Sequence, residues 1–276
     1  MQIVYDKASL SDKVTKYKST GNKITLIPTM GNLHRGHQVL FSKAPNNTIK
    51  VATIYVNPLQ FNNSDDYQNY PRSLQADFEV CRESNINLVY APDGDISSEI
   101  VIEKSADLPK FTRYLCGQKR EGHFLGVYKI VKFLFSIVNP DFACFGKKDF
   151  QQLLLIKYLA NTYFPKTHII DVDTVRTPNN IALSSRLNRL SKESLSSTFR
   201  IYESLQNMRS ELLKGKVFDK LKEESVEYLA NNNIHVEYLD LRSLITLEEA
   251  SDKLKSCGIF IACYVDGVRL IDNIEI

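Results

Sequence analysis

The chain has 276 residues, 43% of them hydrophobic and 24% charged, which is long enough for one large core or two smaller domains. Its 35 basic and 32 acidic residues leave a net charge of +3, so charge gives no argument for nucleic-acid or membrane partners. No stretch has the length and apolarity of a membrane span, and residues 1–6 lack the pattern of a signal peptide, so we expect a cytoplasmic protein.

The first 170 or so residues alternate short apolar strands with helical segments. Strands are predicted at residues 23–28, 49–56, 87–90, 141–145 and 168–172, and helices at 36–43, 73–84, 122–138 and 150–163. Short apolar strands joined by helices are typical of a parallel sheet covered on both faces, the doubly wound α/β class. Ligands of such sheets lie at the carboxyl ends of the strands, so we expect residues 28–37, 57–61 and 146–152 around one site.

The composition changes after Val175. Residues 191–233 are helical in pattern and polar, followed by a predicted strand at 235–240, a helix near 247–255 and strands at 259–265 and 268–271. Asp266-Gly267 between the last two strands is a strong hairpin signal. We therefore expect two domains: an α/β domain over residues 1–176 and a smaller α+β domain over 177–276.

The five cysteines show neither a paired pattern nor metal-ligand spacing. They are Cys81, Cys116, Cys144, Cys257 and Cys263. Their odd number, and the absence of a C-x-x-C pair, indicate reduced thiols in a reducing compartment.

The most informative motif is His34-Arg35-Gly36-His37, directly behind an apolar strand. It places two imidazoles one turn apart at a helix start, where unpaired backbone N–H groups and the helix dipole favour phosphate. Two histidines there can donate hydrogen bonds to a phosphate under attack. The alternatives are a metal pair, which needs a third ligand, and a helix start with incidental histidines. Gly31 and Gly36 have Walker-loop spacing, but His37 stands where that loop requires Lys.

Two further segments follow predicted strands. In residues 56–61 the Gln60 amide can both donate to and accept from a substrate, although Asn-Pro also favours an ordinary surface turn. In residues 145–152, Gly146 allows close approach of a ligand, Lys148 can neutralise phosphate and Asp149 can accept from ribose hydroxyls. Gln152 follows one turn later. The alternative here is a helix start capped by Asp149.

A fourth segment, residues 181–186, ends in Ser184-Ser185-Arg186. Two hydroxyls and a guanidinium can clamp a triphosphate. The alternative is a polar loop between domains.

Taken together, these motifs resemble those of the pantoate–β-alanine ligase (pantothenate synthetase) family. In chain order they are Pro-Thr-Met-Gly and His-x-Gly-His (28–37), Val-Asn-Pro-x-Gln-Phe (56–61), Tyr-Pro-Arg (70–72), Phe-Gly-x-Lys-Asp-Phe-Gln-Gln (145–152) and Ser-Ser-Arg (184–186). The segment Arg269-Leu270-Ile271-Asp272-Asn273 resembles the ending of that family. The resemblance runs from about residue 20 to residue 276.

The resemblance implies a Rossmann-like domain of the H-x-G-H adenylyltransferase superfamily with a C-terminal lid domain, working as a homodimer. It implies ATP and Mg²⁺, the substrates pantoate and β-alanine, and the products pantothenate, AMP and pyrophosphate through a pantoyl adenylate. His37, His34 and Lys148 would be catalytic. ATP would contact Met30, Gly31, Asn32, Leu33, His34, Arg35, Gly36, His37, Gly146, Lys147, Lys148, Asp149, Val175, Leu183, Ser184, Ser185 and Arg186, and the substrates Pro28, Met30, Gln60 and Gln152.

Four positions depart from the family pattern. Lys147 replaces the usual Glu, Leu183 a common Met, Leu187 a common Asn, and Arg35 an acidic or polar residue. These bear on ATP affinity. Lys147 and Leu187 also leave open a degenerate ATP-binding regulator. A second alternative is a nucleotidyltransferase of the same superfamily, against which the Gln60 and Gln152 segments and the C-terminal domain argue. No metal ligand is predicted, because Asp65 and Asp66 are interpreted as an exposed acidic turn.

Overall fold

The computed structural model describes residues 1–100, 108–250 and 255–276. The chain divides into two compact units, each described here by itself. The first unit comprises Met1–Pro109, Arg120–Lys147 and Gln152–Asp173, and the second comprises Lys110–Lys119, Lys148–Gln151 and Thr174–Ile276. Among the described residues, no helix combines the length and apolarity needed to cross a membrane.

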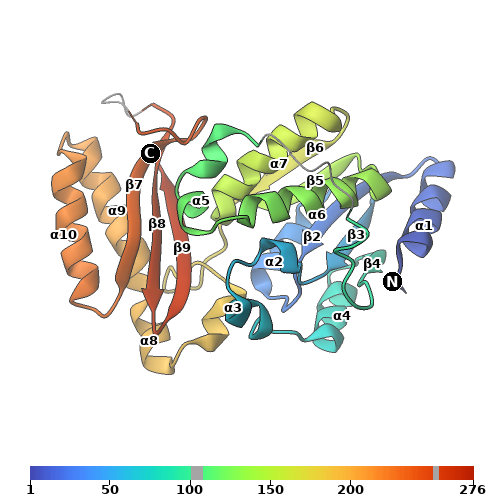
Figure 1. The fold of residues 1–276 in the computed structure, drawn as a ribbon, viewed down its shortest axis with the longest axis horizontal. Helices are drawn as coiled ribbons and strands as arrows, with labels where there is room; N and C mark the ends of the chain where they lie inside the picture. The colour runs from blue at the N-terminus through green and yellow to red at the C-terminus, as the bar shows by residue number, and fades with distance from the viewer. Residues whose placement is uncertain (101–107, 251–254) are drawn as a thin grey trace. The chain divides into compact units, whose positions relative to one another are not determined.

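The first unit is built on a six-stranded parallel sheet in the order β1-β4-β3-β2-β5-β6 (Figure 1). The strands are β1 (Gln2–Val4), β2 (Lys23–Thr29), β3 (Thr48–Ile54), β4 (Leu88–Tyr90), β5 (Phe142–Gly146) and β6 (His168–Val172). The helices are α1 (Lys7–Ser19), α2 (Arg35–Ser42), α3 (Ser64–Gln68), α4 (Leu74–Glu83), α6 (His123–Val138) and α7 (Phe150–Tyr163), with a 3₁₀ turn η1 (Pro58–Gln60). The predicted parallel α/β sheet is confirmed.

Helices cover both faces of this sheet. Phe41 of α2 and Phe78 of α4 pack with Ile27 and Ala52 in one apolar cluster. On the other face, α1 and α6 contact each other and β2. Strands β3, β2 and β5 lie inside the sheet and are buried on both faces, so each is a nearly continuous apolar run in the sequence.

The second unit contains a three-stranded antiparallel sheet in the order β7-β8-β9. Its strands are β7 (His235–Ser243), β8 (Cys257–Val265) and β9 (Val268–Glu275), and its helices are α5 (Cys116–Lys119), α8 (Lys192–Ser197), α9 (Phe199–Leu213) and α10 (Phe218–Ala230), with the 3₁₀ turns η2 (Lys110–Arg113) and η4 (Ser185–Arg189). A third turn, η3 (Lys147–Asp149), contributes its last two residues. Asp266 and Gly267 both have positive φ, 48° and 71°, as a two-residue type I′ hairpin requires.

The predicted helix near residues 247–255 is wrong over its described part. Residues 247–250 are not helical, and Glu249 forms an isolated antiparallel bridge with Arg242 of β7. Leu247 has a positive φ of 54°, which a right-handed helix cannot contain. The Ala250 N–H donates to the Leu241 carbonyl, so backbone groups that a helix would use are bonded to β7. Residues 251–254 of the predicted helix lie outside the described residues.

Candidate active site

The order of the parallel strands shows where a ligand is expected. From β2 the chain proceeds through β3 to β4 on one side, and from β5 to β6 on the other. The direction of winding therefore reverses between β2 and β5. In open α/β sheets this reversal, at the carboxyl ends of the strands, is the usual ligand position. The segments that leave this edge are residues 30–37 after β2 and the start of η3 after β5.

Pro28 ends the pairing of these two strands. Pairing of β2 with β5 stops at Leu26 and Ala143. Alternate residues of a strand direct their backbone groups to opposite neighbours, and Thr29 accepts from Tyr55 on the β3 side. Position 28 therefore faces β5. Because proline has no N–H, the ladder cannot continue through it, and β2 and β5 are unpaired at their carboxyl ends.

A buried carboxylate shapes the loop that follows β2. Asp77 of α4, only 2% exposed, accepts hydrogen bonds from the backbone N–H groups of Asn32 at 2.9 Å and Leu33 at 2.7 Å. The Ser73 hydroxyl donates to the same carboxylate at 3.2 Å. Gly31 has a φ of +81°, and a Cβ there would lie 2.8 Å from Asp77 Oδ2. The loop thus rests directly on this carboxylate.

The two histidines of the H-x-G-H motif form a reciprocal cap at the start of α2. His34 Nδ1 accepts from the Gly36 N–H at 3.1 Å, and His37 Nδ1 accepts from the His34 N–H at 3.1 Å. The expectation that this helix start presents unpaired N–H groups is therefore wrong for these two groups. With Nδ1 accepting, each neutral ring carries its proton on Nε2. The imidazole donors of the motif are thus the two Nε2–H groups, on rings whose centroids lie 4.2 Å apart.

Gln60 lies in η1, against the residue that follows β2. Its Nε2 donates to Met30 Sδ at 3.0 Å, and its Oε1 accepts from Asn57 Nδ2 at 3.1 Å. The Gln60 carbonyl accepts from His123 Nδ1 at 2.7 Å. The structure therefore brings together Met30 and Gln60, two of the predicted substrate-binding residues, and makes η1 more than a surface turn.

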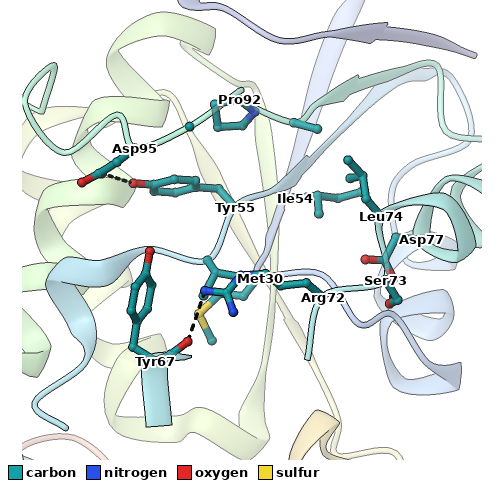
Figure 2. A pocket seen from close by; sticks show the side chains of 13 residues that line it. Met30, Ile54, Tyr55, Tyr67, Arg72, Ser73, Leu74, Asp77, Pro92 and Asp95 are labelled. Carbon is teal, nitrogen blue, oxygen red and sulfur yellow. Dashed lines mark hydrogen bonds between the residues drawn. The ribbon is translucent and has the colours of Figure 1, made fainter. Parts of the chain in front are cut away.

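A cavity of about 390 Å³ opens at the carboxyl ends of β2, β3 and β4. Figure 2 shows Met30, Tyr55, Tyr67 and Arg72 around it. Arg72 donates to the carbonyls of Tyr67, Gln68 and Tyr70 at 3.0–3.2 Å and lies over the Tyr67 ring. This accounts for the Tyr-Pro-Arg motif, because a guanidinium can hold three carbonyls at once.

In the second unit, the residues predicted to bind ATP lie on a small hairpin, at the start of η4 and on η3. The Leu183 N–H donates to the Val175 carbonyl at 2.9 Å, and Ser184 caps η4 by accepting from the Arg186 N–H at 3.3 Å. Lys148 and Ser184 line the same small cavity. The structure therefore brings the Lys148 and Ser184 segments together within this unit. Gln152 is half-buried on α7 in the first unit.

Comparison with known proteins gives the same family along the whole chain. The family model described as pantoate-beta-alanine ligase matches residues 2–275. Pantothenate synthetase of Aliivibrio fischeri is 36% identical over 280 residues, covering 100% of this chain and 96% of the relative. The chain belongs to the pantoate–β-alanine ligase family.

Solved structures of this ligase family agree with that assignment. The crystal structure of pantothenate synthetase from Thermus thermophilus matches with a TM-score of 0.89 at 32% identity, covering 100% of this chain and 99% of that one. Pantoate-beta-alanine ligase from Francisella tularensis, complexed with beta-gamma ATP and beta-alanine, matches with a TM-score of 0.83 at 31% identity, covering 100% and 97%.

Two departures from the ligase family pattern have a structural explanation. Lys147 Nζ lies 3.0 Å from Asp173 Oδ1, so its charge is partly balanced within the first unit. Leu187 is buried in the apolar cluster of the second unit, to which Leu205 and Leu270 also belong. Its replacement of a polar residue therefore adds to the core. Nothing in the structure explains Arg35 or Leu183.

Asp77 is the residue that the sequence analysis missed. It lies on the buried face of α4, beside Phe78 and with Cys81 one turn further on. A carboxylate on the buried face of an amphipathic helix is costly unless it is hydrogen-bonded. That position, shortly after Tyr-Pro-Arg, was the signal that could have revealed it.

Proposed function

We propose that this chain condenses pantoate with β-alanine, using ATP, through a pantoyl adenylate. The observation that supports this most strongly is the two-histidine cap in the loop after β2, at the point where the parallel sheet reverses its winding. Membership of the pantoate–β-alanine ligase family over residues 2–275 supplies the substrates.

In the first step, a carboxylate oxygen of pantoate attacks the α-phosphorus of ATP. A bond forms between that oxygen and phosphorus, the bond from phosphorus to the bridging oxygen breaks, and pyrophosphate leaves. Negative charge on the phosphate oxygens grows during the attack. We assign His34 and His37, through their Nε2–H groups, and Lys148, through its ammonium, to stabilise that charge.

In the second step, the amine of β-alanine attacks the activated carbonyl. A carbon–nitrogen bond forms, the carbon–oxygen bond to AMP breaks, and the amine loses a proton as pantothenate is released. We assign Pro28, Met30, Gln60 and Gln152 to hold pantoate, with Gln60 next to the incoming amine. The domain over residues 177–276 would act as a lid that keeps water from the adenylate.

The remaining assignments concern the nucleotide. We assign residues 30–37, 146–149, 175 and 183–186 to bind ATP. The described residues contain no group of three or more His, Cys, Asp or Glu that could hold a metal ion. Mg²⁺ in nucleotide sites is held largely by phosphate oxygens and water, so we propose that it enters bound to ATP and supplies neutralising charge there.

Oxygen labelling tests the proposed route. Pantoate labelled with ¹⁸O in its carboxylate should transfer one label to AMP, because the attacking oxygen stays with phosphorus when the amide forms. Mass spectrometry of AMP and pantothenate measures this. Unlabelled AMP would contradict attack at the α-phosphorus.

Product analysis separates the alternatives. For the ligase, free AMP accumulates only when pantoate and β-alanine are both present. A stable adenylylated product would instead indicate a nucleotidyltransferase. ATP binding without pyrophosphate release in the presence of pantoate would indicate a regulator.

We further propose a homodimer that works in the cytoplasm, with the domain boundary near residue 176. Light scattering should give twice the chain mass of 31.6 kDa. A monomer with full activity would exclude the dimer as a requirement. Cell fractionation tests the location.

A further inference from the structure

The motif Arg269–Asn273 has no task in the mechanism proposed above. It lies in β9, the last strand of the second unit. Asp272 is paired with Ile261 of β8, and Asn273 with Phe260. Successive residues of a strand point to opposite faces, so Asp272 and Asn273 reach different sides of this sheet. Both are nevertheless buried, at 5% and 9% exposure.

On one face, Asp272 holds Arg176 in a bidentate ion pair. Arg176 Nη1 lies 2.6 Å from Asp272 Oδ2, and Nη2 lies 2.8 Å from Oδ1. The Asp272 side chain is only 4% exposed and the Arg176 side chain 14%. The guanidinium also lies 3.4 Å from the centre of the Tyr202 ring. A bidentate pair of this kind fixes both position and orientation.

Arg176 is itself part of the hairpin that precedes Ser184, so the ion pair with Asp272 also holds this hairpin. It forms an antiparallel bridge with Ala182, and its Nη1 donates to the Asn180 carbonyl at 3.2 Å. The neighbouring Val175 carbonyl accepts from the Leu183 N–H. The position of Ser184 is therefore tied, through this hairpin, to Asp272.

On the other face, Asn273 holds the main chain of Lys148. Asn273 Nδ2 donates to the Lys148 carbonyl at 3.0 Å. Phe260, the cross-strand partner of Asn273, packs on Phe150 with ring centroids 5.5 Å apart. The segment that presents the Lys148 ammonium thus rests on this face of the sheet.

We propose that Asp272 and Asn273 are positioning residues that fix the Ser184–Arg186 segment and the Lys148 turn relative to each other for ATP. Both segments belong to the second unit, so one strand sets the distance between them. The inference rests on the proposed roles of Lys148 and Ser184–Arg186 in binding ATP. It assigns the Asp-Asn pair to nucleotide binding rather than to the stability of the sheet alone.

The test compares steady-state kinetics of Asp272→Asn and Asn273→Asp with those of the wild-type enzyme. Asn273→Asp keeps the shape but places a carboxylate against the Lys148 carbonyl. We expect the ATP KM to rise about tenfold in each variant, the effect of losing one charged or buried hydrogen bond, with pantoate and β-alanine KM values within about twofold. Arg176→Lys, which keeps the charge but loses the fork, should show a smaller rise of the same kind.

Glu237→Gln is the matched control. Glu237 forms a partly buried ion pair with Arg269 in the same sheet, at 2.6 Å, but contacts neither ATP segment through it. It should lower the thermal midpoint without changing the ATP KM. If Glu237→Gln raises the ATP KM as much as Asp272→Asn does, general loss of stability explains the effect and the inference fails.

Lys148→Ala separates this inference from the proposed function. In a Lys148→Ala background, Asn273→Asp should have little further effect, because the two act through one segment. If Lys148→Ala lowers turnover while the Asp272 and Asn273 variants keep a wild-type ATP KM, the proposed site stands and the inference is overturned. If Lys148→Ala itself changes nothing, the assignment of Lys148 fails and the inference fails with it.

Discussion

At the residue scale, the two ring nitrogens of His37 have different tasks. Nδ1 accepts from the His34 N–H and completes the helix cap, whereas Nε2–H is the group assigned to the phosphate. A substitution that removes the ring removes both. The structural and chemical contributions can be separated because an Asn side chain places an acceptor near the position of Nδ1 but has nothing at Nε2.

We therefore expect both His37→Ala and His37→Asn to lower turnover at least about a hundredfold, the usual effect of losing a group that stabilises transition-state charge. His37→Asn should keep the thermal midpoint, because the cap acceptor remains. Pyrophosphate release and thermal unfolding measure the two effects. Wild-type turnover in His37→Asn would show that the ring acts only as a cap.

Asp77 gives a second prediction at this scale. Asp77→Asn replaces one acceptor by an NH₂ group that faces a backbone N–H. We expect the free energy of unfolding to fall by about 1–3 kcal/mol, the usual cost of a buried unsatisfied polar group. The ATP KM should rise, because Asn32 and Leu33 lose their support. Glu79→Gln, on the exposed side of the same helix, is the control and should change neither quantity.

The sequence indicates those candidate site residues that stand in short motifs, because their spacing alone suggests the chemistry, and their roles stay predictions. His34, His37 and Gln60 are of this kind. It could not predict that two Nδ1 atoms close a cap, or that Asp77 supports a loop 44 residues earlier, because these depend on which side chain the fold brings to which backbone N–H. Whether groups from the two units surround one nucleotide stays a prediction.

At the element scale, helix α6 and turn η1 approach so closely that only glycine fits between them. A Cβ on Gly126 would lie 2.0 Å from the Leu59 carbonyl oxygen and 2.6 Å from the Gln60 nitrogen. The Gly126 carbonyl also accepts from Asn57 Nδ2 at 3.2 Å. The backbone of α6 at Gly126 therefore determines the position of η1, the turn that carries Gln60.

Gly126→Ala tests this contact through the sign of its effect. In an ordinary helix interior, the change to Ala stabilises by roughly 0.5–1 kcal/mol. Here we expect destabilisation, together with a raised pantoate KM, because the turn must move. Chemical denaturation and kinetics measure the two. Ser136→Ala on the exposed face of the same helix is the control, and a stabilised Gly126→Ala with a normal pantoate KM would contradict the prediction.

Elements with strong apolar runs or clear helical spacing were predictable. The bounds of β6 and α7 agree with the prediction, and β2 differs by one residue. Strand β1 and helices α1 and α3 were not predicted, because β1 has only three residues and α1 is mostly polar, with only Leu10 and Val14 buried. The helix predicted at residues 247–250 was wrong because this segment pairs with β7, a tertiary contact that local sequence does not show.

At the scale of the whole molecule, the five cysteines, interpreted from the sequence as reduced thiols, are free in the structure, and all five are buried. Burial raises the pKa of the Cys81, Cys144 and Cys263 thiols to about 12. Below that value they are protonated, and therefore weak nucleophiles, while the protein is folded.

We expect a thiol reagent at pH 8 to label the native enzyme slowly and to leave its turnover unchanged. In denaturant, all five thiols should react rapidly, because unfolding exposes them to the reagent. For Cys81, Cys144 and Cys263, unfolding also removes the burial that raised their pKa. Mass spectrometry counts the labels over time. Rapid native labelling with loss of turnover would mean that a thiol is accessible and important for function.

Pro28 has a consequence that extends beyond the sheet. The pairing of β2 with β5 ends before Pro28, which has no N–H to donate, so no backbone hydrogen bond joins these strand ends before a ligand arrives. Pantoate therefore enters without breaking a backbone hydrogen bond between the two strands. Less of its binding free energy is then spent on rearranging the protein. A valine at position 28 would restore the missing backbone N–H donor and allow the pairing of β2 with β5 to continue to the ends of the strands.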